Sequence, residues 1–90
     1  MTGPEMADAR AALGDLWGLG RPLRLAEMGR ALGLRNQDPG QSISDYERGR
    51  TKVSGTMAVL VSLYLRGILP PDGVAAISAP EPKAYRGRSR

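Results

Sequence analysis

The chain of 90 residues contains no cysteine, no histidine and no phenylalanine, and only one tryptophan. Without cysteine, disulfide bonds and thiolate metal sites are excluded. Without histidine, the chain lacks the usual general base at neutral pH and the commonest zinc ligand. Ser42 and Ser44 therefore have no histidine to activate them, and the carboxylates form no recognisable metal cluster. We expect the protein not to be an enzyme and to need no cofactor and no metal.

The sequence also lacks a long hydrophobic run. Its longest apolar stretch, from Met57 to Leu65, is interrupted by Ser62 and is far shorter than the roughly 20 residues that a membrane-spanning helix needs. The first five residues contain no basic region followed by an apolar run, so no secretory signal is evident. We expect a cytoplasmic protein that does not enter a membrane.

Basic residues exceed acidic ones, but they are unevenly placed. The last twelve residues, 79–90, contribute +3 of the net charge of +4, from four basic side chains and one acidic one. Proline and arginine in this segment predict a disordered tail (79–90) after a folded domain (1–78). The tail either contacts DNA, through the minor groove or the backbone, or only increases solubility. The folded domain must present its own cations locally if it binds nucleic acid.

Apolar periodicity, capping residues and glycine breaks predict five helices in the folded domain. In order, they are expected at about 2–17, 25–32, 39–48, 54–66 and 72–78. Their predicted caps include Thr2 with a reciprocal Glu5, Asp38 followed by Pro39, Ser54 and Asp72. The valine-rich residues 59–61 also fit a strand, but the length, cap and closing glycine of their segment favour a helix. The fold class expected is therefore all-α.

Two of the expected helices suggest which side chains are buried. In the second helix, Arg24, Glu27 and Arg30 are expected to face solvent. The fourth is apolar nearly all round, which is typical of a central helix or of one that a partner covers. We expect its inward side chains to be Val59, Leu60 and Leu63. A homodimer contact is expected from Met57, Val61, Tyr64, Leu65, Val74 and Ile77, although all six also fit the core of a monomer.

The third expected helix is anchored by apolar residues, ends at a glycine and is followed directly by cations and hydroxyls. This order of residues resembles the lambda-repressor/Cro-like helix-turn-helix family over about Leu23 to Ile77. The resemblance is carried by Ile43, Tyr46, Glu47, Arg48 and Gly49, with support from Met28, Leu32, Gly33, Ser54, Leu60 and Leu63. It implies a five-helix bundle whose second and third helices bind double-stranded DNA, the third in the major groove, commonly as a homodimer on a near-palindromic operator.

The resemblance also implies a set of site residues. Base contacts are expected from Gly40, Gln41, Ser42, Ser44 and Asp45. Phosphate contacts are expected from Arg35, Asn36, Arg48, Arg50, Thr51 and Lys52. Gln41 also fits as a capping partner. Asp45 fits a cytosine contact, an acidic group that disfavours wrong sites, or a merely solvated residue. Glu47 looks like the family's structural glutamate, which pairs with an arginine of the early helices.

Two features depart from the family. The segment from Gly33 to Ile43 is longer by about four residues than the usual turn, and Leu25 stands where a glutamine is frequent. We expect a dimeric, sequence-specific transcriptional regulator, most simply a repressor of a small operon such as that of a phage or other mobile element. The alternative is an antitoxin or adaptor of the same fold that binds a protein partner through the apolar fourth helix or the basic tail. A solvated helix followed by a turn is the neutral interpretation of residues 42–52.

Overall fold

The computed structural model describes residues 1–34, 37–71 and 73–78. Within these residues the regular secondary structure is entirely helical, with five α-helices and no strand. They are α1 (Gly3–Leu16), α2 (Leu25–Ala31), α3 (Pro39–Glu47), α4 (Gly55–Leu65) and α5 (Val74–Ser78). The predicted all-α class is therefore confirmed, and residues 59–61 are helical. The expected tail, the expected phosphate contacts Arg35 and Asn36, and the expected cap Asp72 lie outside the described residues.

Capping hydrogen bonds explain where α1, α3 and α4 begin, and a glycine explains where α3 ends. Thr2 and Glu5 form the predicted capping box, in which each side chain accepts a hydrogen bond from the other's backbone N–H. Asp38 and Ser54 each accept a hydrogen bond at 3.2 Å from the backbone N–H three residues ahead. Gly49, with φ 77°, ends α3 in the left-handed conformation that glycine adopts without steric cost. These four predicted boundaries are confirmed.

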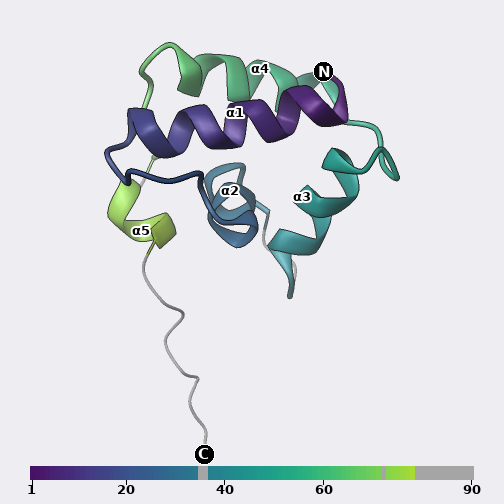
Figure 1. The fold of residues 1–90 in the computed structure, drawn as a ribbon, viewed down its shortest axis with the longest axis horizontal. Coiled ribbons are helices and arrows are strands. Elements are labelled where there is room, and N and C mark those ends of the chain that lie inside the picture. Colours follow the sequence, from purple (N-terminus) through teal and green to yellow (C-terminus); the bar gives the residue numbers. More distant parts are fainter. Residues whose placement is uncertain (35–36, 72, 79–90) are drawn as a thin grey trace, which may run out of the picture.

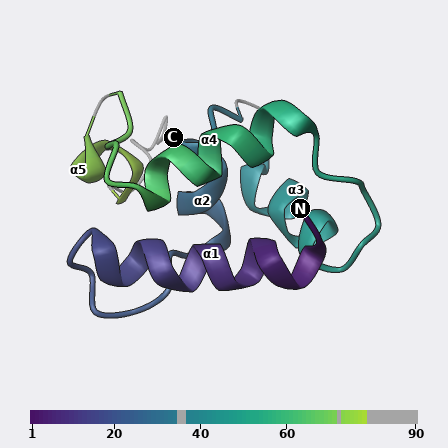
Figure 2. The ribbon, with the colours of Figure 1, turned by 90° about the horizontal axis from the view of Figure 1, so that it is seen from above.

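The helices form two groups. α1 and α4 lie side by side along the length of the molecule, as both views show (Figures 1 and 2). α2 and α3 pack against each other, and α3 lies at the same end of the molecule as the start of α1. α5 packs on α2 at the other end (Figure 1). No helix in the part of the chain that the structure describes is long and apolar enough to cross a membrane.

The hydrophobic core lies where the first four helices meet. Its fully buried large side chains are Met6, Leu13, Leu23, Met28, Ile43, Val61 and Tyr64. The ring of Trp17 meets that of Tyr64 edge-on, with centroids 5.5 Å apart and planes at 73°. The hydroxyl of Tyr64 donates to the carbonyl oxygen of Ala31 at 2.5 Å, and burial raises the pKa of Tyr64 above its ordinary value. Tyr64 of α4 thus contacts the end of α1 and the end of α2 at once.

The burial pattern of α4 differs in part from the prediction. Val59 and Leu63, which are expected to face inward, are 60% and 40% exposed. Leu60 is partly buried and packs against the core, as expected. The prediction failed for the first two because a helix that is apolar nearly all round has no periodic signal to identify its inner face.

Three of the six residues expected at a dimer contact are buried inside the monomer. Val61, Tyr64 and Ile77 are at most 4% exposed. The prediction for these three is wrong, because the core of the chain already covers them. Met57, Leu65 and Val74 are partly or fully exposed, so a dimer contact through them stays a prediction.

Candidate nucleic-acid interface

α2 and α3 approach each other closely through two glycines. A Cβ atom added to Gly29 would lie 2.6 Å from the Cβ and 2.7 Å from the carbonyl oxygen of Pro39. A Cβ atom added to Gly40 would lie 3.1 Å from the backbone nitrogen of Ala26. The helix backbones are therefore in contact where larger residues would hold them apart, and this contact sets the position of α3 on α2.

The same contact decides which face of α3 is accessible. Gly40 and Ile43, three residues apart on one side of the helix, are both buried. The expectation that Gly40 contacts a base is therefore wrong, because Gly40 faces α2 rather than solvent. Gly40 and Ile43 are the two buried residues of α3, and the other candidate base contacts on this helix are exposed or partly exposed.

The outer surface of α3 carries the other four candidate base contacts. Gln41 is exposed, and Ser42, Ser44 and Asp45 are partly exposed. The side-chain amide nitrogen Nε2 of Gln41 donates to Oδ1 of Asp45 at 3.0 Å. This hydrogen bond spans one helical turn, so the two polar groups lie next to each other on the same face of α3.

The segment after α3 is held by a Schellman turn. The N–H of Gly49 donates to the carbonyl oxygen of Tyr46 at 3.1 Å, and the N–H of Arg50 donates to that of Asp45 at 2.8 Å. We call residues 48–52 the cationic turn. Its exposed candidate phosphate contacts are Arg48, Arg50, Thr51 and Lys52. The cations therefore stand at the carboxyl end of α3, where the helix dipole also favours positive charge.

Among the residues that the structure describes, Asp45 restrains the guanidinium of Arg50 through a loose ion pair. Its Nη1 lies 3.8 Å from Oδ1 of Asp45, and 62% of the Arg50 side chain is exposed. Exposed pairs of this kind contribute little stability, about 0 to 1 kcal/mol, so another anion can replace the carboxylate at small cost.

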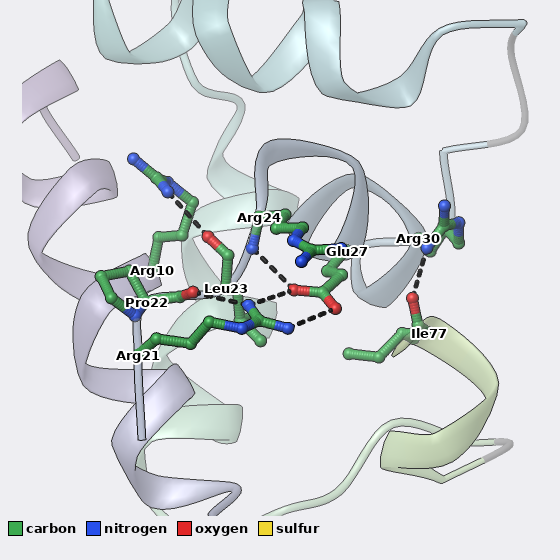
Figure 3. Close-up of polar contacts among 8 residues, drawn as sticks. All are labelled: Arg10, Arg21, Pro22, Leu23, Arg24, Glu27, Arg30 and Ile77. Carbon is green, nitrogen blue, oxygen red and sulfur yellow. Dashed lines mark hydrogen bonds and ion pairs between the residues drawn. The ribbon is translucent and has the colours of Figure 1, made fainter. Parts of the chain in front are cut away.

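The carboxyl end of α3 is fastened to α1. Nε and Nη2 of Arg10 donate to the two carboxylate oxygens of Glu47 at 2.7 and 3.2 Å. Nη1 of Arg10 donates to the carbonyl oxygen of Leu23 at 2.7 Å (Figure 3). The backbone at Gly3 also packs on α3, since an added Cβ would lie 2.4 Å from the Glu47 carbonyl oxygen. The prediction that Glu47 pairs with an arginine of the early helices is confirmed.

α2 is held at both ends by arginines (Figure 3). Nη1 and Nη2 of Arg21 donate to the carboxylate of Glu27 at 2.9 and 3.1 Å, and the N–H of Arg24 donates to it at 2.7 Å. The guanidinium of Arg21 and the N–H of Arg24 together hold the pKa of Glu27 below its ordinary value, although burial acts in the opposite direction. At the other end, the guanidinium of Arg30 donates to the carbonyl oxygen of Ile77 in α5.

The prediction that Glu27 faces solvent is wrong, since it is 3% exposed. A signal was present in the sequence: Glu27 lies three residues after Arg24, the N-cap of α2, which is the position from which a glutamate reaches back to the cap.

The structure therefore brings together an amide, two hydroxyls and a carboxylate on the outer surface of α3 and places an exposed cationic turn directly after them. Among the expected DNA-contacting residues that the structure describes, only Gly40 is removed from this surface. Comparisons of the chain with protein-family models, curated proteins and solved structures gave no match.

Proposed function

We propose that the protein is a sequence-specific DNA-binding regulator in which α2 and α3 act as a helix-turn-helix and α3 enters the major groove. The observation that carries this proposal is the adjacency of the polar outer surface of α3 to the cationic turn. The major groove of DNA is wide enough for an α-helix and displays a distinct pattern of donors and acceptors for each base pair.

Different side chains take different parts in this proposal. Gln41, Ser42 and Ser44 carry short or planar polar groups suited to base edges. Arg50, Thr51 and Lys52 contact phosphates, because cations and hydroxyls bind the DNA backbone without regard to sequence. The loose ion pair of Arg50 supports its proposed contact with a phosphate. Its guanidinium is exposed, and leaving Asp45 costs little free energy.

The contacts that hold α3 in place favour sequence-specific recognition of DNA over non-specific electrostatic attraction to it. The bidentate contact between Arg10 and Glu47 and the close packing of Gly29 on Pro39 fix both ends of the helix. A reading surface that is rigid before binding loses less conformational entropy when it docks. This distinguishes the arrangement from a solvated surface helix.

We further propose that the protein acts as a homodimer and represses transcription by covering its operator. Exposed apolar side chains on α4 and the segment after it support a contact with another protein surface. They are Val59, Leu63, Leu65, Ile68 and Leu69. The same surface is the observation that favours the second candidate, an adaptor or antitoxin that binds a different protein.

Selection of bound duplexes from a random pool, followed by footprinting, tests these proposals together. DNA binding predicts enrichment of one motif, and a homodimer predicts two inverted half-sites about one helical turn, 34–36 Å, apart. A single asymmetric motif would contradict the dimer and leave DNA recognition standing. No enrichment of any motif would contradict sequence-specific binding and favour the adaptor.

A further inference from the structure

We propose that Asp45 is a positioning residue: it orients the amide of Gln41 for a base contact and keeps the guanidinium of Arg50 beside α3 until a phosphate replaces it. This inference rests on the proposed DNA-binding function. It assigns to Asp45 a role other than direct contact with cytosine.

Asp45 determines the orientation of the Gln41 amide. A carboxylate only accepts hydrogen bonds, so the group that Gln41 turns toward Asp45 must be its Nε2, as the 3.0 Å contact shows. The amide nitrogen has two hydrogens, and this contact uses one. Gln41 keeps its second N–H and its acceptor Oε1, the pair of groups that contacts N7 and the N6 amino group of adenine. Asp45 thus selects one of the two flipped orientations of the amide.

Asp45 also contacts the cationic turn. Oδ1 of Asp45, the atom that accepts from Gln41, is also the atom 3.8 Å from Nη1 of Arg50. The carbonyl oxygen of Asp45 accepts from the N–H of Arg50 at 2.8 Å and from that of Thr51 at 3.4 Å. One residue therefore contacts the proposed base-reading side chain and the proposed phosphate-binding turn.

Asp45 is less exposed than Gln41 and Arg50, the two residues that its side chain contacts. The Asp45 side chain is 29% exposed, whereas that of Arg50 is 62% exposed and Gln41 is exposed as a residue. The two partners of Asp45 are thus more accessible than Asp45 itself. The negative charge that stays behind when Arg50 moves to a phosphate disfavours backbone binding at sites where Gln41 gains no base contact.

Base-pair discrimination measures this role. Each base pair of the selected duplex is substituted in turn, and the ratio of dissociation constants is determined for wild type, Gln41→Ala, Asp45→Ala, Asp45→Asn and the Gln41→Ala/Asp45→Ala double variant. Gln41→Ala should reduce discrimination at one base pair by roughly 5- to 150-fold, the range for a bidentate contact. Asp45→Ala should reduce it at the same base pair by about 5-fold or more, and the double variant no further than Gln41→Ala alone.

Asp45→Asn and a control variant at Asp8 separate orientation from charge. Asp45→Asn keeps an oxygen that accepts from Gln41 and should retain most of the discrimination. Asp8→Ala removes an exposed carboxylate from α1 and should leave discrimination at that base pair unchanged. Asp45→Ala should also bind random duplexes more tightly than Asp8→Ala does, because only Asp45 lies beside Arg50. Circular dichroism melting of each variant establishes that it is folded.

Loss of discrimination at a different base pair in Asp45→Ala, or additive losses in the double variant, would show that Asp45 contacts a base itself and would overturn the inference. Unchanged discrimination in Asp45→Ala would overturn it as well. In both cases wild type still selects its motif, so the proposed function stands. A wild-type protein that discriminates among no duplexes would overturn the proposed function and the inference together.

Discussion

Three carboxylates illustrate how surroundings assign a residue its role. The side chain of Glu27 is 4% exposed and that of Glu47 is 14% exposed, and each accepts two hydrogen bonds from one guanidinium. The side chain of Asp45 is 29% exposed and meets its guanidinium only at 3.8 Å. Bidentate, partly buried pairs hold the helices in place, whereas the loose and accessible pair is free to exchange partners.

Glu27 leads to a prediction about stability and pH. Glu27→Gln should lower the free energy of unfolding at pH 7 by about 1 to 3 kcal/mol, because the buried charge-assisted hydrogen bonds from Arg21 and Arg24 are weakened. The pKa of Glu27 in the folded protein lies below its ordinary value of 4.5, so the carboxylate stabilises the fold above that value. This stabilisation is lost as the pH falls through the folded-state pKa.

Urea unfolding of wild type and Glu27→Gln at pH 7 and pH 3 measures this effect. The difference in the free energy of unfolding between the two proteins should be smaller at pH 3 than at pH 7. Asp8→Asn, at an exposed position of α1, serves as the control and should change stability by less than about 0.5 kcal/mol. A gap of equal size at both pH values would contradict the proposed role of the Glu27 charge.

At the scale of helices, local signals predicted the ends and long-range packing decided the faces. Thr2, Asp38 and Ser54 bond to backbone groups three residues away, so their effect is readable from the sequence. The inner face of α4 depends on where α1 and α2 lie, which explains why the expected inward orientation of Val59 and Leu63 is wrong. The burial of Gly40 depends likewise on its contact with α2.

The contact between α2 and α3 leads to a prediction at this scale. Gly29→Ala should destabilise the protein by about 1 to 3 kcal/mol, because the new methyl group overlaps Pro39 and the helices must separate. Helix propensity alone predicts the opposite sign, since alanine is favoured over glycine by about 1 kcal/mol.

Gly55→Ala is the matched control, since a Cβ atom there would meet no other part of the described chain within 4 Å. It should leave stability unchanged or raise it slightly in thermal unfolding. A Gly29→Ala variant as stable as Gly55→Ala would contradict the close contact between α2 and α3.

At the scale of the whole molecule, the candidate site consists of residues that lie close together in the sequence. The contacts that hold these residues in place join distant parts of the chain. The sequence indicated the outer residues Gln41, Ser42, Ser44 and Asp45 and the cationic turn because they lie close together along the chain. It did not indicate that Arg10 anchors the end of α3, since that contact joins residues 37 positions apart. The partner of Glu47 could be predicted only as a class, an arginine of the early helices.

The most direct test of the account is the salt dependence of DNA affinity in wild type, Arg50→Ala and Arg66→Ala. Arg66, the exposed C-cap of α4, serves as the control, because the carboxyl end of α4 lies away from α3 in both views (Figures 1 and 2). We predict that the logarithm of wild-type affinity falls linearly with that of salt concentration, by about 0.9 per neutralised phosphate, and that only Arg50→Ala reduces this slope by about 1. Binding that is insensitive to salt, or equal slopes in all three proteins, would contradict the proposal that the cationic turn after α3 binds phosphates.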